Sequence, residues 1–161
     1  SSDLLARMFL GFIRNGFKQV ATDMSAFNVF MKSNISLVIS GVYPNYSIDF
    51  TKLIVTKGTL TGADGASAVA AAGRKVTISW VDNTGTGDAL ATDKAMQLLI
   101  NYTKGAVVQD TTTKTRADIT NDLTVPASWV GDDVHAYLSF WDAAGARVAD
   151  SVFLDTVTIL A

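Results

Sequence analysis

The chain of 161 residues has no cysteine, no glutamate, only two prolines and a single histidine. The lack of cysteine excludes disulfide bonds, thiolate metal sites and cysteine nucleophiles. All fifteen acidic residues are aspartates, which favour turns and helix caps, so the composition fits a loop-rich β protein. A Ser–His–Asp triad would have to use His135, yet no Gly-x-Ser-x-Gly elbow is present to supply the serine.

Charged residues are also scarce, at 17% of the chain, with a formal net charge of −2 and a pI near 5.1. No basic field is available to hold nucleic acid, so we expect no nucleic-acid partner. The mean hydropathy of +0.26 is high for a soluble monomer, and part of the apolar surface is therefore expected in contacts between subunits. No apolar run reaches the roughly 20 residues of a membrane span.

The first thirty residues carry apolar side chains at the three-four spacing of one helical stripe. The stripe consists of Leu4, Leu5, Met8, Phe9, Phe12, Ile13, Phe17, Val20, Met24, Phe27 and Met31. We expect a long amphipathic helix over residues 1–33, about 43 Å in length if it is continuous at 1.5 Å per residue. Gly11 and Gly16 weaken it, so packing has to compensate. The helix can cover its own domain or insert into another subunit.

Residues 34–49 form a transition segment, and strand patterns follow over residues 50–161. Alternation and turn signals predict strands near 49–57, 67–71, 75–81, 96–102, 106–110, 116–125, 133–141 and 147–160. Several short strands with turns at regular spacing are typical of an antiparallel β-sandwich. The predicted fold is therefore mainly β, with an immunoglobulin- or fibronectin III-like sandwich after the N-terminal helix.

The most regular alternation lies at residues 133–141. Val134, Ala136, Leu138 and Phe140 point to one face, which suits a core, while His135, Tyr137, Ser139 and Trp141 point to the other. Three explanations compete for the aromatic rings on that second face: the N-terminal helix covers them, a neighbouring subunit buries them, or they stack on a sugar. Covering by the helix is the first expectation.

No other pattern indicates catalysis or a cofactor. Asp82, Thr84, Thr86 and Asp88 alternate in a Gly-containing loop, as oxygen ligands of hard cations do, but an acidic twelfth ligand is missing and a solvated turn is the preferred interpretation. Nucleotide-binding glycine loops are absent from the sequence. We therefore predict no catalytic residue, no cofactor, no metal site and no enzymatic activity.

Two resemblances refine this interpretation. Residues 76–80 (Val-Thr-Ile-Ser-Trp), then Leu123 and Pro126 before the alternating strand, and a last strand from Arg147, resemble a fibronectin type III or immunoglobulin-like domain. Those domains place a buried corner tyrosine where this chain has Val134. The resemblance implies a sandwich.

The chain as a whole is similar to a large family, mostly from Bacteroidetes, known only as a domain of unknown function. The matching stretches are residues 16–18, 26–28, 42–50, 53–58, 131–137 and 150–152. That family implies no established activity.

Low charge, high hydropathy and an apolar segment before the sandwich favour a non-enzymatic structural subunit that self-assembles. We expect it at the cell surface or outside the cell, in a filament, a surface layer or a phage-like particle, with copies of itself as partners. The alternative is an adhesion module that binds a glycan or another surface protein. The predicted assembly interface comprises Leu5, Phe9, Phe12, Phe17, His135, Tyr137 and Trp141.

Overall fold

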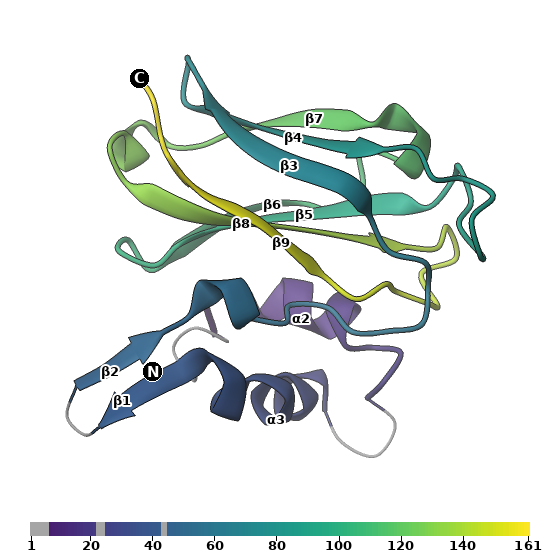
Figure 1. Ribbon diagram of the computed structural model, residues 1–161, viewed down its shortest axis with the longest axis horizontal. Helices are drawn as coiled ribbons and strands as arrows, with labels where there is room; N and C mark the ends of the chain where they lie inside the picture. Colours follow the sequence, from purple (N-terminus) through teal and green to yellow (C-terminus); the bar gives the residue numbers. More distant parts are fainter. Residues whose placement is uncertain (1–6, 22–24, 43–44) are drawn as a thin grey trace.

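A computed structural model describes residues 7–21, 25–42 and 45–161. It is mainly β, as predicted, with antiparallel pairing throughout the sheets (Figure 1). Two helices and a hairpin come first: α2 (Leu10–Gly16), α3 (Ala26–Val38), β1 (Ile39–Val42) and β2 (Asn45–Ile48). The sandwich strands are β3 (Asp64–Ala71), β4 (Lys75–Val81), β5 (Lys94–Asn101), β6 (Ala106–Asp110), β7 (Thr120–Thr124), β8 (Asp133–Trp141) and β9 (Val152–Thr158). Short 3-10 turns stand at η1 (Phe50–Lys52), η2 (Arg116–Asp118) and η3 (Ala127–Trp129).

The sandwich consists of a three-stranded sheet, ordered β3-β4-β7, and a four-stranded sheet, ordered β6-β5-β8-β9. Alternation along the strands determines which side chains enter the space between them. Val76, Ile78 and Trp80 of β4 point inward, and they meet Leu138 and Phe140 of β8 from the opposite sheet. This packing forms the first hydrophobic core.

The four-stranded sheet has a second apolar face, which the N-terminal part of the chain covers. We call α2, α3, the β1–β2 hairpin and η1 the N-terminal layer; it lies below this sheet in Figure 1. Met96, Leu98 and Ile100 of β5 point toward the layer, because they alternate with the residues that face the first core. Together with the phenylalanines of the layer they form a second core. The sheet is thus shared by two cores.

The single long helix predicted over residues 1–33 is wrong. Helix α2 ends at Gly16, and α3 begins after Ser25, whose hydroxyl accepts a hydrogen bond from the Asn28 amide at 3.2 Å. In a straight helix Phe9 and Phe30 would stand about 32 Å apart. The break instead brings their ring centroids to 5.5 Å, edge to face. Tertiary packing of phenylalanines therefore overrides the local helical pattern.

Some predicted strand boundaries also require correction. Residues 49–57 form η1 and then an unpaired extended segment, in which the Lys57 amide donates to the Gly16 carbonyl at 2.9 Å and the Val55 amide to the Ser151 hydroxyl at 3.0 Å. The strand predicted over residues 116–125 is shorter, because η2 occupies its first part. The last strand covers Val152–Thr158 within the predicted 147–160. The backbone amides of residues 55 and 57, which the prediction placed in a sheet, therefore bond to a side chain and to the N-terminal layer instead of to a neighbouring strand.

The two glycines of α2 are expected to respond in opposite ways to substitution by alanine. A Cβ at Gly11 would meet nothing within 4 Å, whereas one at Gly16 would lie 2.6 Å from the Val55 carbonyl oxygen. Gly11→Ala should therefore raise the free energy of unfolding by about 0.5–1 kcal/mol. Gly16→Ala should lower it by about 1–3 kcal/mol, because the extended segment has to move. Urea titration of both variants measures this, and equal effects would contradict the close approach at Gly16.

Candidate functional site and interaction surfaces

Most of the residues predicted to form an assembly interface are buried within the folded chain. Phe9, Phe12, Phe17 and Tyr137 are at most 2% exposed and belong to the second core. Leu5 lies outside the described residues. His135 and Trp141 are half-buried. The structure brings the phenylalanines and Tyr137 together as predicted, but within one chain, so these four side chains are not on the surface of the folded subunit.

The N-terminal layer covers the aromatic face of β8. The Tyr137 hydroxyl donates a hydrogen bond to the Phe50 carbonyl at 2.6 Å, and the His135 ring stacks on the Phe50 ring with centroids 3.7 Å apart. Burial raises the pKa of Tyr137 far above its usual range, with a smaller contribution from the Asp49 carboxylate. Of the three explanations for this face, the structure shows covering by the chain itself for Tyr137, but the hydrogen-bond acceptor lies in η1 and not in the predicted helix.

Tryptophans offer little free ring surface for stacking on a ligand. Trp129 is 3% exposed and packs in the first core. Trp141 is half-buried against the second core, and its indole N–H donates to the Thr111 carbonyl at 3.0 Å. The Trp141 side chain is therefore only partly available to an external partner.

His135 gives the chain a predicted pH dependence. Burial lowers the pKa of His135 below its ordinary 6.5, and the nearby Asp133 carboxylate opposes the shift only partly. The folded protein thus favours the neutral ring, so this contribution to stability is complete above pH 6.5 and is lost as the pH falls through that value. We expect the midpoint of thermal unfolding to fall between pH 7.5 and pH 5.5, where aspartates do not yet titrate, and His135→Phe to reduce that fall.

The control for this expectation is His135→Phe at pH 7.5. The variant keeps an aromatic ring on Phe50 but loses the exposed hydrogen bond between His135 Nδ1 and Thr156 Oγ1, so it should unfold only slightly below the wild-type temperature. If wild type and His135→Phe lose stability equally between the two pH values, titration of His135 is not the cause.

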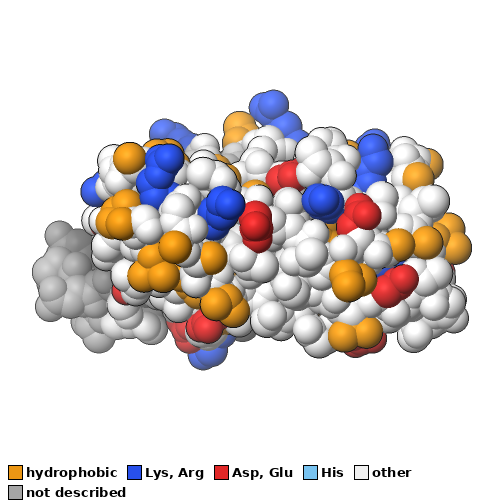
Figure 2. Space-filling model, turned by 90° about the horizontal axis from the view of Figure 1, so that it is seen from above, with side chains coloured by type: hydrophobic (Ala, Val, Ile, Leu, Met, Phe, Trp, Pro, Cys, Tyr) orange, Lys and Arg blue, Asp and Glu red, His pale blue; other side chains and the backbone are white. Residues whose placement is uncertain are grey.

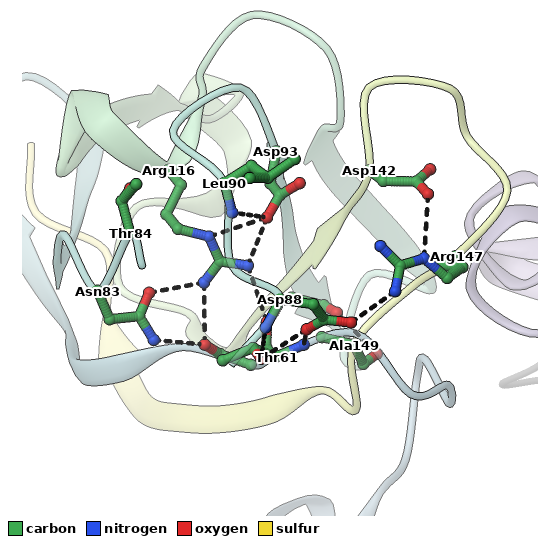
Figure 3. A network of polar contacts seen from close by, with 12 residues as sticks. Thr61, Asn83, Thr84, Asp88, Leu90, Asp93, Arg116, Asp142, Arg147 and Ala149 are labelled. Carbon is green, nitrogen blue, oxygen red and sulfur yellow. Dashed lines mark hydrogen bonds and ion pairs between the residues drawn. The ribbon is translucent and has the colours of Figure 1, made fainter. Parts of the chain in front are cut away.

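A buried polar network closes one end of the sandwich, around Arg116 (Figure 3). Its guanidinium donates to Asp93 Oδ2 from Nε at 3.1 Å and from Nη2 at 2.9 Å, and to the Asn83 side-chain oxygen from Nη1 at 2.7 Å. It also donates to the Thr61 and Gly62 carbonyls and lies 4.1 Å above the Phe140 ring. Arg116 and Asp93 are both fully buried. The network joins four loop segments, which indicates a structural role.

A second, more exposed set of contacts lies beside it in Figure 3. Arg147 bridges Asp88 at 2.5 Å and Asp142 at 3.4 Å. Hydrogen bonds from Thr61, with a smaller contribution from Arg147, lower the pKa of Asp88 from 3.8 to about 2. These carboxylates are thus occupied by donors from the chain itself.

The two aspartates of the loop at residues 82–88, where oxygen-bearing side chains alternate as cation ligands do, are likewise engaged by groups of the chain itself. The Asp82 carboxylate accepts hydrogen bonds from the Thr84 amide and hydroxyl, and Asp88 faces Thr61 and Arg147. Among the residues that the structure describes, no cluster of three or more His, Cys, Asp or Glu side chains could hold a metal ion. The same part of the chain contains no helix long and apolar enough to cross a membrane.

The outer face of the β3-β4-β7 sheet differs from the covered sheet, because no other part of the described chain packs over it (Figures 1 and 2). Its side chains are mainly small and uncharged, with a few charges of both signs. They are Ser67, Val69, Ala71, Lys75, Thr77, Ser79, Val81, Thr120, Asp122 and Thr124. Val69 and Val81 are 60% and 55% exposed. This is the open surface of the described chain, and it was not predicted from the sequence.

Strand β3 is the missed element of that surface. The sequence indicated only a short strand near residues 67–71, because the alanines and serines around it carry little hydrophobic contrast. The structure extends it to eight residues at the edge of the sheet. The sequence nevertheless contained one signal. Exposed edge strands usually contain a charge or a proline, whereas residues 65–73 contain neither.

The chain matches the model of one protein family. The model of a family of unknown function, DUF6266, matches residues 3–155, nearly the whole length. The chain belongs to the DUF6266 family. This confirms the predicted membership of a family without an assigned activity. No curated protein matches this DUF6266 chain.

Among solved structures, the DUF6266 chain is similar to the fn3 domain of the human collagen alpha-1(XX) chain. The sequence identity is 10% and the TM-score 0.47. The alignment covers 65% of this chain and 90% of the fn3 domain.

Proposed function

We propose that this DUF6266 chain is a non-enzymatic structural subunit that assembles with copies of itself, outside the cell or at its surface. A filament, a surface layer and a phage-like particle are the assemblies that such a subunit would build. The observation that carries the proposal is the contrast between the two sheets. One is sealed by the chain's own N-terminal layer, whereas the other leaves open a nearly neutral face and an edge strand that carries no charge after Asp64.

Surface charge supports the same proposal. Lys75, at the beginning of β4, and Asp122, in the middle of β7, are charged side chains of opposite sign on the open face, and their charges cancel. Two identical faces that each carry a net charge would repel one another, but this face carries none of consequence. The whole chain has a net charge of only −2. Copies of the chain can therefore approach through this surface without a large electrostatic cost.

The contact surface in this proposal differs from the one predicted from sequence. Phe9, Phe12 and Phe17 already contribute to the second core, so exchanging them between subunits would first require the layer to leave its sheet. That step would expose a wide apolar surface to water. Contacts through the uncovered sheet need no such opening.

The proposal is tested by light scattering of the purified chain over a series of concentrations, with negative-stain microscopy of the same samples. We expect the mean mass to rise above 17.1 kDa with concentration and regular polymers or closed oligomers to be visible. A mass that stays at that of one chain up to the highest soluble concentration would overturn the proposal.

The alternative is an adhesion module that binds a glycan or another surface protein. The half-buried Trp141 supports it, since part of its side chain remains accessible at the end of strand β8. An adhesion module should remain a monomer and bind glycans on an array, and Trp141→Ala should abolish that binding. Trp129 is too deeply buried to serve as a second stacking residue.

A further inference from the structure

Four strands stand at the edges of the two sandwich sheets, and β3 differs from the other three. Strands β6 and β7 have only five residues and include Asp110 and Asp122. Strand β9 contains Asp155, and its register shifts opposite Ala136 and Tyr137. Charges, shortness and bulges are the devices that keep edge strands from pairing with other chains. After one irregularity between Asp64 and Ser67, β3 pairs regularly with β4 up to Ala71 and carries no charge there.

The outer backbone of β3 is unpaired. Alternate N–H and C=O groups of an edge strand point away from its single neighbour. Within the described chain, no hydrogen bond beyond the β3–β4 ladder reaches residues 65–71. The turn at Gly73 and Arg74 is different, because their amides donate to the carbonyls of Ala161 and Leu160. The chain's C-terminal residues thus lie beside the end of β3, and β9 of the opposite sheet passes close to β3 without bonding to its outer backbone.

We propose that β3 of one copy pairs antiparallel with β3 of a second copy, centred on Val69, and joins two three-stranded sheets into one. This inference rests on the proposed function and names its contact. Val69 is the middle residue of the regular stretch 67–71, and its side chain is 60% exposed. Antiparallel pairing about Val69 places the two valines opposite one another, and such an apolar cross-strand pair stabilises a sheet.

The charges at the two ends of β3 favour a second copy of the chain as the partner and favour antiparallel over parallel pairing. The strand begins at the acidic Asp64, and the turn after its other end leads to the basic Lys75; both side chains are exposed. In the antiparallel register centred on Val69, Ser67 of one copy lies opposite Ala71 of the other, so Asp64 lies beyond Ala71, beside the turn that leads to Lys75. By the two-fold symmetry, this contact between an acidic and a basic end occurs twice in the dimer. A parallel arrangement would bring like charges together.

The cross-linking test uses the absence of native cysteine. Val69→Cys introduces a single thiol at the proposed two-fold axis, and Val81→Cys introduces one of similar exposure on the neighbouring strand. Val81 pairs with Asp64, five residues from the axis, so two copies of residue 81 would stand about 30 Å apart. Disulfides require Cα atoms within about 7 Å. Oxidation by glutathione disulfide should link the full-length Val69→Cys chain into dimers and leave Val81→Cys monomeric.

A charge at the same position provides an independent readout. Val69→Lys should abolish the concentration-dependent rise in mass, because two ammonium groups would face one another at the axis. Its thermal unfolding should match that of the wild type, since the Val69 side chain is mostly in solvent. Val81→Lys is the matched control and should still associate.

The outcomes separate this inference from the proposed function. If the wild type associates but Val69→Lys does so equally well, or Val81→Cys cross-links as readily as Val69→Cys, β3 pairing is overturned while self-assembly stands. If the wild type stays monomeric and Val69→Cys forms no dimer, both proposals are overturned.

Discussion

Replacing Arg116 with methionine should lower the free energy of unfolding by about 3–5 kcal/mol, because it leaves the Asp93 carboxylate buried without its counter-ion. Both side chains are fully buried, and Asp93 Oδ2 accepts from Nε and Nη2 of Arg116 and from the Leu90 amide. The substitution also deprives the Asn83 side chain and the Thr61 and Gly62 carbonyls of a donor. Several loops would lose their common anchor at once.

Urea-induced unfolding monitored by tryptophan fluorescence measures this effect. The double variant Arg116→Met with Asp93→Leu should recover part of the loss, because it removes the unpaired charge together with its partner. Arg147→Ala is the matched control, since its contacts with Asp88 and Asp142 are only partly buried and should contribute less than the fully buried pair. Equal destabilisation by Arg116→Met and Arg147→Ala would contradict the central role of the buried pair.

Phe30→Ala should destabilise the chain by about 3–5 kcal/mol and expose the covered face of the four-stranded sheet. Phe30 is fully buried, and its ring contacts those of Phe9 and Phe17 edge to face, with centroids 5.5 and 5.7 Å apart. It is the residue through which α3 holds the segment around α2. Its loss leaves a cavity between the helices, and the N-terminal layer should separate from the sheet at lower denaturant concentrations than the sandwich unfolds.

Two measurements distinguish this result from global unfolding. Hydrogen exchange should accelerate in α2 and α3 more than in β4 of the first core, and an apolar dye should bind the variant before the main unfolding transition. Phe27→Ala in the same helix is the control, because Phe27 is only half-buried and should lose less stability. Uniform acceleration of exchange through β4 would show that the layer has no separate opening transition.

The sequence predicted those parts of the fold in which local pattern and tertiary environment agree. In β8 the strict alternation placed Val134 and Phe140 on a core face and Tyr137 on the opposite face, and the structure confirms this division. That the opposite face belongs to a second core is known only from the structure. The prediction of one long helix was wrong because the three-four spacing of apolar residues does not show where the chain turns. That break depends on contacts between Phe9, Phe17 and Phe30, which only the folded layer brings together.

The interaction surfaces were harder to predict for related reasons. The phenylalanines predicted to lie between subunits are buried within one chain. Hydrophobicity alone does not distinguish a side chain buried in its own core from one buried between subunits. Asp93 and Arg116 are 23 positions apart, in segments that have no shared periodicity, so nothing local pairs them. The open edge of β3 becomes visible only when sheet order is known.

The shared four-stranded sheet has a consequence for how the chain is made. Its central strands, β5 and β8, provide the surface on which the N-terminal layer docks, yet β8 ends at Trp141, more than a hundred positions after Phe30. A ribosome adds about 5–20 residues each second, so the layer has to wait on the order of 5–20 s for that surface. During this interval its phenylalanines are exposed to water. The nascent chain is therefore expected to need a chaperone until the second half of the sandwich has been translated.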